Sequence, residues 1–154
     1  MKPGTITETT LLVIGYGNTL RSDDAAGPHV AEQIGALGIP GIRALVCPQL
    51  APELAAELVD ALSVVFVDAT ADTTHEVELV PIAPAESSRV TTHTISPPTL
   101  LALAQELYGA APAAWLLKVP AANLDHGEGL SELTQRGVET AVGKIQTLVA
   151  EWTF

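Results

Sequence analysis

Positive charge is scarce in this sequence. Seven lysines and arginines stand against 18 aspartates and glutamates, which gives the 154-residue chain a net charge of −11. A surface this acidic repels nucleic-acid phosphates and anionic lipid headgroups. We therefore expect no nucleic acid and no membrane among its partners. Cations or a basic peptide segment fit the charge better, although the charge also serves solubility.

Cysteine and long apolar runs are scarce as well. The single cysteine, Cys47, cannot form an intrachain disulfide and fits a reducing compartment. No apolar run approaches the roughly 20 residues of a membrane-spanning helix. Residues 1–8 (MKPGTITE) lack the apolar segment of a signal peptide. These absences predict a cytoplasmic protein. The length predicts one domain over residues 1–154, and we expect the protein to be a monomer.

What is present is an alternation of short apolar runs and helical patterns. Strands are expected near residues 11–14, 41–46, 63–68, 76–80 and 114–119, and helices near 28–37, from 52 to 58, 96–108 and 131–152. This order contains several strand–helix–strand crossovers, which predict an α/β fold with a mostly parallel, twisted five-stranded sheet covered by helices on both faces. The run at 76–80 alternates polar and apolar residues, which favours an antiparallel edge strand.

The segment at residues 11–27 (LLVIGYGNTLRSDDAAG) is the most informative stretch. It begins as a buried strand, breaks at Gly15 and Gly17, and places Asp23 and Asp24 just ahead of a helix. The third glycine of a dinucleotide-binding fingerprint is replaced by Leu20. Two carboxylates would also oppose a phosphate at the helix N-terminus, so a dinucleotide cofactor is disfavoured.

The paired acids have two interpretations. Acidic residues near a helix N-terminus are stabilised by the helix dipole, and one aspartate meets that need. A second aspartate adds like-charge repulsion, which a bound cation would relieve. The composition of this stretch alone leaves both interpretations open.

Two further residues favour a metal site. Asp68 closes an otherwise apolar strand, so it belongs at the carboxyl edge of the sheet, where ligands of open α/β sheets bind. If the first and third strands are neighbours, Asp24 and Asp68 converge there, and His93 lies in the loop ahead of the next helix. Two carboxylates and an imidazole are a suitable ligand set for zinc or nickel. The other histidines are expected at the surface (His29, His75) or as a reserve ligand (His126).

These residues resemble the hydrogenase maturation proteases, the peptidases that trim the large subunit of nickel–iron hydrogenases. Residues 14–28 (IGYGNTLRSDDAAGP) are similar to the family signature Gly-x-Gly-Asn-x-Leu-x-x-Asp-(Asp/Glu)-x-x-Gly. Weaker matches follow in the family's order, at residues 67–69, at His93 with Ser96 and Pro97, and at residues 107–109 and 127–131. The chain departs from the pattern at Ala25, where many members have glycine, and at Pro98, where some members have the histidine.

The resemblance implies a three-layer α/β/α sandwich and a specific activity. The expected enzyme is a nickel-dependent endopeptidase that removes a C-terminal extension from the large-subunit precursor after nickel insertion. The nickel is expected in the precursor rather than as a permanent cofactor. Alternatives are a non-catalytic nickel or hydrogenase-assembly binding module, and a hydrolase with a metal of its own.

The resemblance also assigns residues. Asp24, Asp68 and His93 fall on the metal-site positions and are the predicted catalytic and metal-binding residues. The turn is predicted to be shaped by Gly15, Gly17 and Asn18, with Asn18 as a hydrogen-bond donor to substrate. Asp23 is expected to support the metal site or to make a polar contact.

Overall fold

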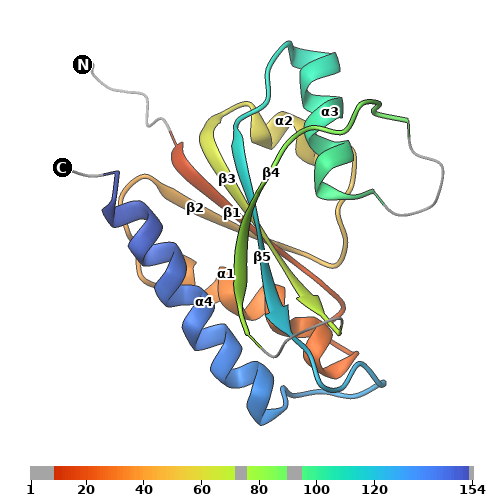
Figure 1. The fold of residues 1–154 in the computed structure, drawn as a ribbon, viewed down its shortest axis with the longest axis vertical. Coiled ribbons are helices and arrows are strands. Elements are labelled where there is room, and N and C mark those ends of the chain that lie inside the picture. The colour runs from red at the N-terminus through yellow and green to blue at the C-terminus, as the bar shows by residue number, and fades with distance from the viewer. Residues whose placement is uncertain (1–8, 72–75, 90–94, 153–154) are drawn as a thin grey trace.

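Five strands form one sheet in the order β2-β1-β3-β5-β4. The computed structural model describes residues 9–71, 76–89 and 95–152. In chain order, the elements are β1 (Thr9–Tyr16), the 3-10 helix η1 (Ser22–Ala25), α1 (Ala26–Ala36), β2 (Ile42–Cys47), α2 (Leu54–Leu58), β3 (Ala61–Thr70), β4 (Glu78–Ile82), α3 (Pro97–Tyr108), β5 (Ala113–Pro120) and α4 (Glu132–Ala150). The helices cover the sheet on two sides (Figure 1), which confirms the predicted α/β/α sandwich.

The sheet is parallel except at one edge. β1 pairs in parallel with β2 and with β3, and β3 pairs in parallel with β5. β4 runs antiparallel to β5, as predicted for the edge strand. β1 and β3 are therefore neighbours, which is the condition under which their carboxyl ends bring Asp24 and Asp68 to one place.

Alternate residues of the strands point to opposite faces and build two apolar layers. On one face, Val13 and Val67 pack with side chains of α1 and α4. On the other face, Ile14 and Phe66 pack with side chains of α2 and α3. The central strands are covered on both sides, which explains why their sequences are continuous apolar runs rather than alternating ones.

The predicted helix ends are confirmed at three positions. Ser96 caps α3 by accepting a hydrogen bond from the Thr99 N–H at 3.3 Å, and Ser131 caps α4 by accepting one from Thr134 N–H at 3.3 Å. Gly109 ends α3 in the left-handed conformation, with φ of 83°. Each of these signals is local, so the sequence pattern was sufficient to find it.

Other element boundaries differ from the sequence prediction. β4 begins at Glu78 rather than at residue 76, and it contains Pro81, which the sequence had suggested for a loop. An edge strand tolerates proline because only one side of the strand needs its N–H groups. The helix expected from residue 52 begins at Leu54. Asp23 and Asp24 lie inside η1 rather than in an irregular turn.

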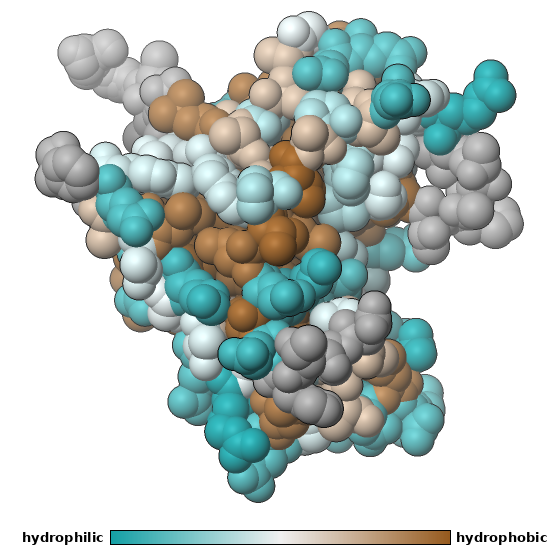
Figure 2. All heavy atoms as spheres, viewed as in Figure 1, coloured by the Kyte–Doolittle hydropathy of each residue, from teal (hydrophilic) through white to brown (hydrophobic). Residues whose placement is uncertain are grey.

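The surface reflects this layering. In Figure 2, apolar residues are visible in the middle of this face, between α4 and α3, while polar residues lie along α4. None of the helices in the described ranges combines the length and apolar character needed to cross a membrane.

Glycine allows α1 to approach the strand ends very closely. A Cβ built on Gly27 would lie 2.5 Å from the carbonyl oxygen of Val67 and 2.6 Å from that of Tyr16. A Cβ on Gly15 would overlap the backbone of Gly27 itself. Because these neighbours are backbone atoms of β1, β3 and α1, they cannot move aside without shifting a whole element.

A matched pair of helical glycines tests this contact. Gly27→Ala is expected to lower the free energy of unfolding by about 3 kcal/mol or more, because the new methyl group must displace backbone. Gly143→Ala on α4 has no atom within 4 Å of the new Cβ, so it should raise stability by up to about 1 kcal/mol. Urea denaturation of both variants measures the difference. Similar effects of the two substitutions would contradict the close approach.

Candidate functional site

One row of chemically active side chains crosses the sheet near the carboxyl ends of its parallel strands. Strand register pairs Cys47 with Tyr16, and it pairs Lys118 with Asp68 on one side and Glu78 on the other. Tyr16 follows Gly15, which pairs with Val67, so Tyr16 lies beside Asp68, to which its hydroxyl is hydrogen-bonded. Tyr16 and Cys47 pack against the apolar layer beneath α2 and α3. Since residues in register share a face, the whole row lies on that side of the sheet.

Asp68 is the electrostatic centre of this row. Burial raises the pKa of Asp68 to about 6, and the negative charge of Asp24 acts in the same direction. Hydrogen bonds from the Tyr16 hydroxyl and the Ala69 N–H partly oppose this rise. Burial and the charge of Asp68 raise the pKa of Tyr16 as well, so its hydroxyl stays protonated and donates to Asp68. The carboxylate is therefore oriented by two donors.

Asp24 reaches the same edge from η1. Its Oδ2 accepts a hydrogen bond from the Asn18 N–H at 2.7 Å. The turn closes so tightly that a Cβ on Gly17 would overlap the carbonyl oxygen of Asp24, and Gly17 has φ of +155°. Glycine at position 17 therefore allows the loop to fold back onto η1. The effect of Asp24 on the pKa of Asp68 shows that the two carboxylates interact.

Asp23, the other acid of the pair, is fully buried and structural. Its carboxylate accepts hydrogen bonds from the N–H groups of Ala122 at 2.8 Å, Asn123 at 2.9 Å and Ser131 at 2.7 Å. The Ser131 hydroxyl donates a fourth bond at 2.8 Å. Burial acts to raise the pKa of Asp23, but these bonds outweigh it and the pKa is lowered. Asp23 thus ties η1 to the loop that leads into α4.

Further bonds hold the same loop against the turn. The Ser22 hydroxyl donates to the Asp125 carbonyl at 2.8 Å, and the Gly127 N–H donates to the Leu20 carbonyl at 2.8 Å. Ser22 adopts a left-handed conformation, with φ of 50°. This conformation is uncommon for a residue other than glycine. The loop at residues 121–131 is therefore one wall of the site rather than a free surface loop.

The histidines are distributed unevenly around this edge. His126 lies exposed in the loop at residues 121–131. His29 is half-buried and lines a cavity of about 280 Å³ between α1 and α4, so it is less exposed than the sequence suggested. The predictions for His75 and His93 lie outside the described residues.

The structure therefore brings together two of the three predicted metal-site residues, Asp24 and Asp68. Within residues 9–71, 76–89 and 95–152, no three acidic, histidine or cysteine side chains form a group able to hold a metal. Because His93 lies outside those ranges, the three-residue site and the roles of its members stay predictions. Sequence reasoning did not identify Tyr16 or Lys118. Tyr16 could have been found, because residues 12, 14 and 16 alternate on one face of β1.

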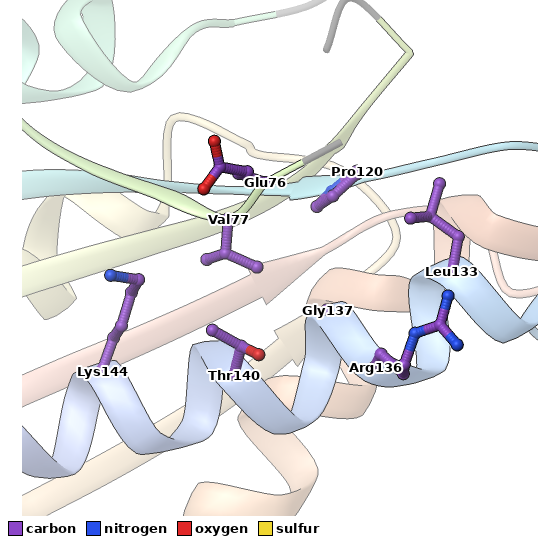
Figure 3. A pocket seen from close by; sticks show the side chains of 8 residues that line it. All are labelled: Glu76, Val77, Pro120, Leu133, Arg136, Gly137, Thr140 and Lys144. Atoms are coloured by element: carbon purple, nitrogen blue, oxygen red, sulfur yellow. The ribbon is translucent and has the colours of Figure 1, made fainter. Parts of the chain in front are cut away.

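A separate cavity lies on the other side of the sheet. It has a volume of about 500 Å³ and is bounded by Val77, Pro120 and the side chains of Arg136, Thr140 and Lys144 from α4 (Figure 3). It contains neither Asp24 nor Asp68. The carboxylates thus belong to an open edge of the sheet and not to this cavity.

Solved structures of hydrogenase maturation proteases have the same fold. The HycI maturation protease of Thermococcus kodakarensis superposes with a TM-score of 0.70 and 25% identity, covering 89% of this chain and 90% of that chain. A hydrogenase 2 maturation peptidase from a Thaumarchaeota archaeon gives 0.70 and 22%, over 92% and 98% of the two chains. Escherichia coli HybD gives 0.68 and 20%, over 94% of each. No protein-family model and no curated protein matches the sequence. The structures confirm the resemblance that the sequence motifs indicated.

The buried anchor can be tested by removing it. Asp23→Ala is expected to lower the free energy of unfolding by about 3 kcal/mol or more, because it leaves the amide donors of residues 122, 123 and 131 unpaired. Asp125→Ala, which removes a carboxylate from the same loop, should change stability by about 0.5 kcal/mol or less. Denaturant titrations of the two variants compare the effects. If Asp23→Ala lowered the free energy of unfolding only as much as Asp125→Ala, the Asp23 carboxylate would not have this structural role.

The raised pKa of Asp68 predicts a pH-dependent stability. Its pKa rises from 3.8 to about 6 on folding, so the folded state binds this proton more tightly than the unfolded state. The associated stability is complete below pH 4 and is lost as the pH rises through about 6. In metal-free buffer, Asp68→Asn should therefore be more stable than wild type by about 1–2 kcal/mol near pH 8, after allowance for partial exposure.

The measurement is a set of denaturation curves for wild type and Asp68→Asn from about pH 4 to pH 8. The difference between the two proteins should grow with pH over this range. Because all other titrating groups are common to both, their contributions cancel. A difference that does not vary with pH would mean that the folded protein leaves the Asp68 pKa at its ordinary value.

Proposed function

We propose that this protein is an endopeptidase that removes a C-terminal extension from a nickel–iron hydrogenase large-subunit precursor after nickel insertion. The observation that supports it most directly is the pair of interacting carboxylates, Asp24 and Asp68, at one sheet edge. The shared fold with hydrogenase maturation proteases supports the same reaction class. The protein is proposed to act as a monomer in the cytoplasm.

The electrostatics of the edge favour a cationic substrate group. The charge of Asp24 makes ionisation of Asp68 more costly, and a cation placed between the two carboxylates would relieve this repulsion. Nickel carried by the precursor is such a cation, and carboxylate and imidazole groups are among its suitable ligands. His93 is the proposed third ligand. A metal held by these residues would polarise the scissile carbonyl or lower the pKa of an attacking water.

The residues of the chain itself hold the two carboxylates ready for this cation. The Tyr16 hydroxyl and Ala69 N–H orient Asp68 on the end of a buried strand. The Asn18 N–H orients Asp24 at 2.7 Å. The Asn18 side-chain oxygen accepts a bond from the Leu20 N–H at 2.9 Å, which directs the amide nitrogen as a donor for a substrate carbonyl. Site and scaffold are therefore preorganised before the precursor binds.

Processing of nickel-loaded precursor tests the proposal. Asp24→Ala, Asp68→Ala and His93→Ala are each expected to slow cleavage by about 100-fold or more, because each removes a proposed metal contact. His126→Ala, which removes an exposed histidine from the neighbouring loop, should cleave at the wild-type rate. The mass of the precursor before and after incubation measures the reaction.

The same experiment separates the alternatives. Full processing by all three alanine variants would contradict the assignment of the site. Loss of cleavage in His126→Ala but not in His93→Ala would move the third ligand to residue 126. Stable binding of the precursor without a change in its mass would indicate a non-catalytic assembly module. Stoichiometric metal in the purified protein would favour a hydrolase with its own metal.

A further inference from the structure

Lys118 occupies an unusual position beside the proposed site. It is the only charged residue of β5, whose sequence is AAWLLKVP. Strand register places it directly next to Asp68 on one side and Glu78 on the other. Because in-register residues share a face, Lys118 lies on the same face of the sheet as Tyr16 and Asp68. A charged residue in a central strand, next to an acid of the site, requires an explanation beyond packing.

Its ion pair with Glu78 leaves the ammonium group available. The Lys118 Nζ lies 4.0 Å from Glu78 Oε1, and the two side chains are 37% and 53% exposed. An exposed pair at this distance contributes little to stability. An ammonium group has three N–H donors, so Lys118 can donate to a second carboxylate while it keeps its contact with Glu78.

The two sides of the edge differ in charge. Beyond Tyr16, the row ends on β2 at Cys47, a half-buried side chain that packs with the apolar layer and carries no cation. On the β5 side, Lys118 is the cation of the row and stands between the acids Asp68 and Glu78. In a protein with a net charge of −11, an anionic group of a bound segment is repelled by Asp68 and attracted by Lys118.

We propose that Lys118 is a specificity residue that binds a carboxylate of the precursor segment, on the β5 side of the cleaved bond. This inference rests on the proposed function, because it assumes that the segment crosses the edge at Asp24 and Asp68. The carboxylate is either an acidic side chain of the segment or the C-terminal carboxylate of the extension. This charge contact on the β5 side, together with contact at Cys47 on the β2 side, would set the direction in which the segment lies.

The experiment measures kcat and KM for cleavage of the nickel-loaded precursor. The enzymes are wild type, Lys118→Met, Lys118→Arg, Glu78→Gln and the control Lys144→Met, whose lysine lines the cavity on the opposite face (Figure 3). The precursors are wild type, a series in which each acid near the cleavage position becomes its amide, and one whose C-terminus is extended by Gly-Ser. Thermal melts verify that each enzyme is folded.

Lys118→Met should raise KM about tenfold with kcat changed less than about twofold, as expected for loss of one charge-assisted contact used in binding. Lys118→Arg should retain most of the affinity, and Lys144→Met should behave as wild type. One precursor change should raise KM for wild type by the same factor and have no further effect on Lys118→Met. An amide substitution with this effect identifies a side-chain carboxylate, and the Gly-Ser extension identifies the C-terminal one.

Three results would overturn the inference while leaving the proposed function in place. Lys118→Met could cleave with the wild-type KM. Alternatively, the increase in KM caused by Lys118→Met could add to the increase caused by every precursor change. Glu78→Gln could raise KM as much as Lys118→Met, which would show that the pair only supports the strand edge. If wild type itself leaves the precursor mass unchanged, the proposed function fails, and this inference fails with it.

Discussion

The approach of α1 to the ends of β1 and β3 is the constraint on which the site depends. Gly15 and Gly27 remove the side chains that would otherwise separate these elements, and backbone meets backbone at the Val67 and Tyr16 carbonyls. This contact places η1 directly above the carboxyl edge of the sheet. Asp24, carried on η1, then lies close enough to Asp68 for its charge to help raise the pKa of Asp68. With a larger residue at either glycine, the two acids would be held apart.

Two adjacent aspartates have opposite surroundings in this arrangement. Asp23 is buried, and its carboxylate accepts four hydrogen bonds from the chain beyond β5. These bonds hold the turn against that part of the chain. Asp24 has one backbone donor and faces another carboxylate, so its charge is left for a cation. Neither acid makes a side-chain cap bond at the start of η1 or α1, so Asp23 serves the loop after β5 rather than its own helix end. One acid anchors the loop, and the other faces the proposed substrate.

The face of the sheet that carries these acids is continued by the strands on both sides. Tyr16 stabilises Asp68 from β1, and Lys118 lies in the next position on β5. The cavity between β4 and α4 lies on the opposite face and shares none of these residues. An open edge suits a substrate that is itself a folded protein with an accessible tail, whereas a closed cavity suits a small molecule.

Local sequence patterns determined the fold class, the order of the elements and the caps at Ser96, Gly109 and Ser131, because apolar periodicity and capping act over a few residues. They also identified the signature around Asp24. They could not decide which acid would be buried, because the donors to Asp23 lie about 100 residues further along the chain. Nor could they place Tyr16 and Lys118 beside Asp68, because strand order and register arise from packing of the whole sheet. The sequence by itself thus determined which groups are available, and the tertiary structure decided which of them meet.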